Sequence, residues 1–224
     1  MQFLRLRRYH LAIGIALVLL GAVPSYATDA EKRELTETSA TRETTVADLQ
    51  KLAASGDANA TVVLGYEYFL GERVPMDREK ALVYYAKAAE LGSDVAMGNI
   101  CNMYLYGYGV EKDPAAAFQW CQNAAKLGNP NAMVMIAEIV FDRQGLLRDK
   151  TEEFRSRLAF QFYEMAASRG HMVGQFNAGK FLEAGVGTTR NVSLAISYSE
   201  ASAKQGYAPA SSALRRLGFG DAAK

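Results

Sequence analysis

The chain has 224 residues, of which half are hydrophobic, with 25 basic and 24 acidic side chains. Such a chain is long enough to bury a continuous core, and a charge so close to zero gives no basis for binding nucleic acid or an anionic membrane surface. Beyond residue 27 the chain has one histidine and two cysteines, too few for a zinc site built from these donors alone. We expect no metal and no cofactor.

The first 27 residues have the layout of a secretory signal peptide. Three arginines within the first eight residues precede an apolar run, Leu11–Val23, and small residues in Ser25-Tyr26-Ala27 follow it. We expect cleavage near Ala27, delivery to the bacterial periplasm and no membrane insertion afterwards. An uncleaved anchor is the alternative. Cleavage removes three basic and no acidic side chains, leaving a net charge of −2. The polar residues 28–45 predict a disordered leader.

From residue 46 onward the sequence repeats itself with a period of 36 residues. Each period closes with a glycine, and the successive steps are 36, 36, 42 and 36 residues: Gly56, Gly92, Gly128, Gly170 and Gly206. A small residue recurs with the same steps: Ala60, Ala96, Ala132, Gly174 and Ala210. An aromatic residue does so as well: Tyr84, Trp120, Phe162 and Tyr198. A fixed period of this length predicts helix pairs that stack and bury their apolar sides against their neighbours.

Within one period the pattern is helix, glycine loop, helix. In the copy from Val95 to Gly128, apolar or small residues first recur every three or four positions, as on one face of a helix. Gly107 and Gly109 interrupt that helix, because glycine adopts backbone angles that other residues avoid. Pro114 then marks the first turn of a second helix, which the closing glycine ends.

This pattern resembles the Sel1-like repeat, a variant of the tetratricopeptide repeat, over about residues 46–218. The first copy carries the motif positions Leu64-Gly65, Tyr68, Gly71, Asp77, Ala81, Tyr84-Tyr85, Ala88-Ala89 and Gly92. The resemblance implies an all-α fold, a right-handed α-solenoid of about ten helices in stacked antiparallel pairs. Residues 46–218 would form about four repeats with flanking half-repeats, and residues 219–224 a tail.

The third copy departs from the pattern, since six extra residues lie between Asp149 and Ala159. Phe154, Leu158 and Phe162 keep four-residue spacing, which predicts an N-terminal extension of that second helix by about a turn and a half. The insert either shapes a binding site or is a tolerated change of loop length.

Cys101 and Cys121 lie in the second copy, one in each predicted helix and about ten residues either side of the loop centre. In an antiparallel pair they would stand at the same height, and an exported protein enters an oxidising compartment. We therefore predict a disulfide, which closes a loop of about 20 residues and contributes roughly 3 kcal/mol. The alternative is two buried free thiols.

The chain carries no recognisable catalytic motif of a hydrolase, zinc enzyme or nucleotide-binding protein after residue 27. Asp77, Asp113 and Asp149 recur with the period, which predicts helix caps and not an acid/base pair. His171 is the single histidine after residue 27 and opens a repeat, so we interpret it as a cap or a solvated side chain.

The resemblance implies a non-enzymatic scaffold that binds a protein partner in its concave groove. Exported relatives act as adaptors, as regulators of the envelope or as immunity proteins, so the expected partner is an envelope protein or a secreted toxin or effector. Some cysteine-rich relatives are credited with binding or hydrolysing β-lactams, but these carry a cysteine pair in nearly every repeat. A third possibility is binding of cell wall or polysaccharide.

In helix-pair solenoids of this type the first helix of each repeat lines the groove. The residue after each small position, with its neighbours one turn away, would therefore face a partner. This set contains aromatic, amide and charged side chains, as protein-binding patches do. The predicted partner-binding residues are Tyr66, Leu70, Asn99, Asn102, Tyr106, Glu138, Asp142, Asn177 and Lys180. Any one of them could instead pack against the next repeat.

Overall fold

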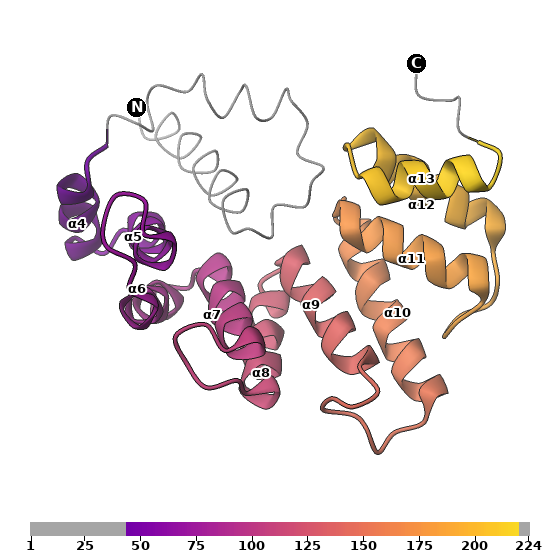
Figure 1. The fold of residues 1–224 in the computed structure, drawn as a ribbon, viewed down its shortest axis with the longest axis horizontal. Helices are drawn as coiled ribbons and strands as arrows, with labels where there is room; N and C mark the ends of the chain where they lie inside the picture. Colours follow the sequence, from indigo (N-terminus) through magenta and orange to yellow (C-terminus); the bar gives the residue numbers. More distant parts are fainter. Residues whose placement is uncertain (1–43, 220–224) are drawn as a thin grey trace. The chain divides into compact units, whose positions relative to one another are not determined.

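The computed structural model describes residues 44–219, so the predicted signal peptide and the leader up to residue 43 lie outside the described part. Within residues 44–219 there are ten α-helices and no strand, which confirms the all-α fold expected from the period (Figure 1). No helix in this range is long and apolar enough to cross a membrane.

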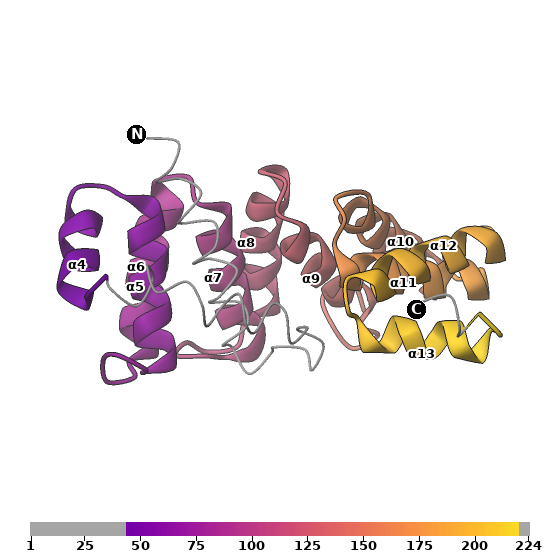
Figure 2. The same ribbon diagram turned by 90° about the horizontal axis from the view of Figure 1, so that it is seen from above.

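The chain divides into two compact units, which meet in sequence between Asp113 and Pro114. In each unit a helix packs mainly against the helix that follows it in the chain (Figures 1 and 2). Unit 1 contains α4 (Val46–Ala54), α5 (Ala58–Leu70), α6 (Arg78–Glu90) and α7 (Asp94–Tyr106). Unit 2 contains α8 (Pro114–Lys126), α9 (Pro130–Phe141), α10 (Glu152–Ser168), α11 (Met172–Ala184), α12 (Val192–Lys204) and α13 (Ala208–Arg216).

Short polar side chains start the helices, as the sequence predicts. Asp77 accepts the N–H of Lys80 at the start of α6, and Asn191 caps α12 in the same way. The prediction is wrong for Asp149: Thr151 caps α10 instead, and Asp149 pairs with Lys150 at 3.2 Å. The insert moves the helix start two residues beyond the aspartate, so a different side chain reaches the first free N–H groups.

The inserted residues lengthen α10 at its N-terminus. This helix has 17 residues, whereas α12, its counterpart in the next repeat, has 13. The four added residues make slightly more than one turn, less than the turn and a half expected. The remaining insert forms the loop between α9 and α10. Arg155, itself buried, holds this loop by donating to the carbonyls of Leu147 and Lys150 at 3.4 and 3.3 Å.

Both cysteines are disulfide-bonded, as the sequence predicts. Cys101 belongs to α7 and Cys121 to α8, and both side chains are fully buried. In the other repeats, the positions equivalent to Cys101 and Cys121 hold a small residue and a larger one. In the first repeat, a β-carbon on Gly65 would overlap the ring of Tyr85.

The glycine loops are tied to the second helix of the preceding repeat by close backbone contact. Gly109 has a φ of +71°, and a β-carbon there would lie 2.6 Å from the Cβ of Arg78 at the start of α6. In unit 2, a β-carbon on Gly187 would overlap the carbonyl of Ser156 in α10. The loops therefore pack against neighbouring repeats, and glycine is needed for space as well as for its backbone angle.

We predict that Gly109→Ala destabilises unit 1 more than Gly92→Ala does. Both glycines have positive φ, but a β-carbon on Gly92 would meet nothing within 4 Å. Gly92→Ala should therefore lose about 1–2 kcal/mol from left-handed strain alone. Gly109→Ala should lose a further 1–3 kcal/mol, roughly, from overpacking against Arg78. Urea unfolding of the two variants measures the difference, and equal losses would contradict the contact.

Candidate protein-interaction face

Five of the predicted partner-binding residues lie in unit 1, on the first helices α5 and α7. Only Tyr106 is widely open to solvent, with 53% of its surface exposed. Leu70 and Asn102 are half-buried. Tyr66 and Asn99 are buried, with 2% and 9% exposed. The open part of this face is therefore smaller than the sequence predicted.

Tyr66 belongs to the interior of unit 1. Its hydroxyl donates to Asn99 Oδ1 at 3.3 Å, and its ring meets the ring of Tyr85 edge-on with centroids 5.6 Å apart. Burial raises the pKa of Tyr66 to about 12, although the hydrogen bond to Asn99 acts in the opposite direction. The expectation that Tyr66 faces the solvent does not hold, because this position also points at the next first helix, α7.

A small cavity of about 10 Å³ lies beside this pair, between Phe69, Tyr85, Asn99 and Asn102. Two amide atoms, Asn99 Nδ2 and Asn102 Oδ1, are buried there without a hydrogen-bond partner in the described part of the chain. The volume admits one water-sized group. A partner side chain does not fit, so Asn99 acts in the packing of α5 on α7.

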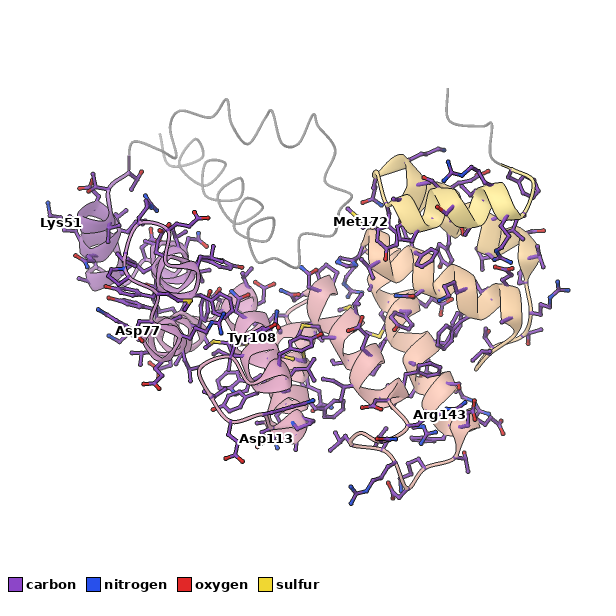
Figure 3. The ribbon with its side chains drawn as sticks, viewed as in Figure 1. Lys51, Asp77, Tyr108, Asp113, Arg143 and Met172 are labelled. Carbon is purple, nitrogen blue, oxygen red and sulfur yellow. The ribbon has the colours of Figure 1, made fainter. Side chains whose placement is uncertain are left out.

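The exposed Tyr106 belongs to an aromatic cluster at the loop end of unit 1. Its ring lies 5.7 Å from that of Tyr108, which lies 5.7 Å from that of Phe69. The guanidinium of Arg78 faces both Phe69 and Tyr108, at 5.3 and 5.0 Å from their centroids. Figure 3 shows Tyr108 in the loop after α7. We define Phe69, Arg78, Tyr106 and Tyr108 as the loop-end cluster.

The sequence prediction missed Arg78, Phe69 and Tyr108. The sequence did contain one signal for Arg78, since it is the single charged residue at its position in the repeat. The equivalent residues of the other repeats are Pro114, Ser156 and Val192. The contact of Arg78 with two rings depends on how the loop folds back onto α6, which the period does not encode.

In unit 2 the predicted residues lie on α9 and α11. Glu138 is exposed, yet partial burial of its carboxyl raises its pKa. Asp142 is the C-cap of α9, and its Oδ1 accepts the N–H of Gln144 at 3.0 Å. This hydrogen bond lies at the start of the loop after α9, in which Figure 3 labels Arg143. Asn177 is half-buried, while Lys180 is exposed.

The structure extends the unit 2 face with two further aromatic residues. Lys180 Nζ lies 5.5 Å from the ring centroid of Phe176, and that ring meets Tyr207 edge-on at 5.1 Å. Burial, and secondarily the charge of Glu138, raises the pKa of Tyr207. Unit 2 thus combines exposed charges of both signs with aromatic surface, as protein-binding patches do.

His171 is the N-cap of α11, one of the two roles that the sequence allowed. Its Nδ1 accepts the N–H of Gly174 at 3.2 Å, so Nε2 carries the proton and donates to Asn131 Oδ1 at 2.7 Å. Burial lowers the pKa of His171 to about 4. Within residues 44–219, no three His, Cys, Asp or Glu side chains lie together as a metal site requires.

The consecutive packing of its helices makes this chain a helix-repeat protein of the α-solenoid type. The family model described as "Sel1 repeat" matches residues 58–93, 94–129, 130–171 and 173–207. The chain therefore belongs to the Sel1 repeat family.

Two curated fungal relatives match about half of the chain. A chitin synthase regulator of Saccharomyces cerevisiae is 34% identical over 118 residues, which are 51% of this chain and 16% of that protein. Chitin synthase regulatory factor 1 of Schizosaccharomyces pombe is 31% identical over 117 residues, 52% of this chain and 25% of that protein. The chain thus matches at most a quarter of the length of these relatives.

Solved structures give the same fold. A Sel1 repeat protein from Oxalobacter formigenes has a TM-score of 0.67 and 26% identity, covering 79% of this chain and 69% of that one. An immunity protein from Pseudomonas aeruginosa has a TM-score of 0.54 and 24% identity, covering 88% and 72%. The second likeness concerns the fold alone.

We predict a large loss of stability on truncating the buried Tyr66 of unit 1 and almost none on truncating the exposed Tyr106. Tyr66→Ala should cost about 3–4 kcal/mol, because it removes a buried ring and leaves Asn99 Oδ1 without its donor. Tyr106→Ala should stay within about 0.5 kcal/mol of the parent, because most of that ring is already exposed. Urea unfolding measures both, and a small loss for Tyr66→Ala would show that its ring is not part of the core.

We also predict an acid-sensitive contribution from His171. The pKa of about 4 lies below the ordinary value of 6.5, so the unfolded chain binds the proton more readily. The stabilisation is present above pH 6.5 and is lost as pH falls towards 4, by at most about 3 kcal/mol. Protonation of Nδ1 also removes the acceptor for Gly174.

The matched control is His171→Asn, because Asn129 caps α9 at the same position of its repeat. This variant keeps a cap and removes the titration. The free energy of unfolding should fall less steeply between pH 6.5 and 4 for the variant than for the parent. Parallel curves would contradict the role of His171.

Proposed function

We propose that this chain is a non-enzymatic scaffold, exported to the bacterial periplasm, that binds a protein partner through the exposed side chains of its first helices. The observation that carries this proposal is the make-up of these faces. Tyr106 in unit 1 and Lys180 in unit 2 are exposed beside aromatic rings, and the exposed Glu138 interacts electrostatically with Tyr207. Aromatic contact area with charged groups at its rim is typical of protein-binding surfaces.

Two observations support an exported protein. The N-terminal sequence has the basic, apolar and small-residue segments of a signal peptide. Both cysteines are disulfide-bonded, and disulfides persist in oxidising compartments such as the bacterial periplasm.

The role within this class is an adaptor, a regulator or an immunity protein. The fungal relatives are named as regulators of chitin synthase, which favours control of another protein over chemistry on a substrate. The Pseudomonas protein is an immunity protein of the same fold, so this fold is compatible with that role. The identity of the bound partner decides between the roles: a secreted toxin indicates immunity, and an envelope protein indicates regulation.

Photo-crosslinking from position 106 tests the proposal. A benzoylphenylalanine replaces Tyr106, the chain is expressed in its bacterial host, and the periplasm is irradiated. We expect a covalent adduct with one protein. The control places the same group at Val83, which is 52% exposed on the second helix α6. Tyr106→Ala should weaken binding of the captured partner by about 1–3 kcal/mol.

Equal adducts from positions 83 and 106, or none from either, would contradict a binding face on α7. Turnover of a chromogenic β-lactam by the purified chain would favour an enzyme. Retention on isolated cell wall without any protein partner would favour polysaccharide binding.

A further inference from the structure

Arg78, the first residue of α6, is a cation held in a fixed position in unit 1. Its guanidinium faces the rings of Phe69 and Tyr108, with 5.3 and 5.0 Å between the guanidinium carbon and the ring centroids. Its backbone is in turn in close contact with the Gly109 loop. Rings and backbone together fix a side chain that normally has many rotamers. Little conformational entropy therefore remains to be lost when a ligand binds to this arginine.

This cation has no counter-ion within the described residues. No carboxylate lies within 4 Å of it, and its Nε is buried without a hydrogen-bond acceptor. The terminal nitrogens, Nη1 and Nη2, donate no hydrogen bond to that part of the chain either, and they are not among its buried, unpaired atoms. An unpaired, half-buried polar group is costly in a folded protein and calls for an explanation. The neighbouring Arg73, in contrast, is paired with Glu67 at 2.6 Å.

Arg78 lines an open cleft of about 670 Å³. The cleft has an apolar wall, from which Met76 projects with 60% of its surface exposed. Its lining residues are Tyr68, Val74, Pro75, Met76, Asp77, Arg78, Glu79, Lys80 and Gly109. Asp77, labelled in Figure 3, precedes α6 and is one of these lining residues.

The other charges of the cleft leave Arg78 available. Asp77 Oδ1 accepts the N–H of Lys80, so this carboxyl is the helix cap. The Lys80 ammonium lies 4.1 Å from the ring centroid of Tyr68, over its face. Glu79 is exposed and makes no ion pair with a described residue. Two acidic and two basic groups line the cleft, so it suits a single negative charge better than a dianion.

We propose that Arg78 binds a carboxylate of the protein partner, from an Asp or Glu side chain or a C-terminus, and that apolar residues beside this carboxylate rest on Val74, Pro75 and Met76. The Nη1 and Nη2 groups donate two parallel hydrogen bonds to the two carboxylate oxygens, the geometry in which a guanidinium fork matches a carboxylate. The proposal rests on the proposed function, because it names the chemistry of that partner. The ring of Tyr108 contacts both Tyr106 and Arg78. A partner that covers Tyr106 therefore also reaches Arg78 within the same unit.

Two short peptides test this chemistry without knowledge of the partner. Acetyl-Gly-Glu-Gly-amide is titrated into the purified ¹⁵N-labelled chain, and acetyl-Gly-Gln-Gly-amide serves as the neutral counterpart. The observable is the side-chain N–H signal of Arg78, assigned by its loss in Arg78→Lys. We expect the Glu peptide to shift this signal to saturation at millimolar concentration and the Gln peptide to leave it unchanged.

Variants separate the fork from simple charge. Backbone amide shifts of the cleft residues report binding to each variant. Arg78→Gln should abolish the response to the Glu peptide, and Arg78→Lys should weaken it by about fivefold or more, because an ammonium keeps the charge but not the paired donors. Arg73→Gln is the matched control and should bind as the parent does. Circular dichroism melts confirm that each variant is folded, and Arg78→Lys keeps the test valid if Arg78→Gln is not.

Three results would overturn the proposal. These are equal shifts with both peptides, an unchanged affinity in Arg78→Lys, and tighter binding of inorganic phosphate than of the Glu peptide. The last result would assign the site to phosphate groups instead of a protein carboxylate. Crosslinking from position 106 is a separate measurement, so a failure of these titrations leaves the scaffold proposal standing. If crosslinking fails while the Glu peptide still binds, Arg78 remains a carboxylate site but the assignment of that carboxylate to a protein partner is lost.

Discussion

Neighbouring helices approach each other so closely that a side chain larger than a methyl group does not fit at certain positions. A β-carbon on Gly174 at the start of α11 would lie 2.6 Å from the Cβ of Ala166 in α10. The corresponding residues Ala60, Ala96 and Ala132 are fully buried. Dense packing leaves no room for adjustment at these contacts, so small residues must recur once in every repeat. The small residues that recur with the 36-residue period of the sequence reflect this steric requirement.

Close packing also decides which polar groups are available for function. The Tyr66 hydroxyl pairs with Asn99 Oδ1 between α5 and α7, and His171 pairs with Asn131 between α11 and α9. A hydrogen bond of this kind contributes about 1 kcal/mol, but losing one buried partner costs more. Such groups are therefore committed to the fold. Charged groups that form neither a hydrogen bond nor an ion pair with residues 44–219, such as the Arg78 guanidinium and the exposed Lys180, are the ones that remain for binding.

The loops carry the differences between repeats. The glycine loop after α7 brings Tyr108 onto Arg78, while the loop after α9 is longer and is held by Arg155. Both arginines lie near the start of a second helix, but one faces aromatic rings and a cleft and the other faces backbone carbonyls. Chemically similar side chains thus serve binding in one unit and loop structure in the other, according to the groups around them.

The sequence by itself determined the helices, their order and most of their caps, because these follow from local spacing and from glycine and small residues at fixed steps. It also indicated the disulfide, because the two cysteines lie about ten residues either side of one loop and so at the same height in an antiparallel helix pair. Only the tertiary structure decided that Tyr66 is buried and Tyr106 is open, although both lie on first helices. The period fixes which way a residue points from its own helix, whereas exposure depends on what the next helix places opposite it. The same reason explains why Arg78, with rings from two different segments around it, could not be found from the repeat pattern.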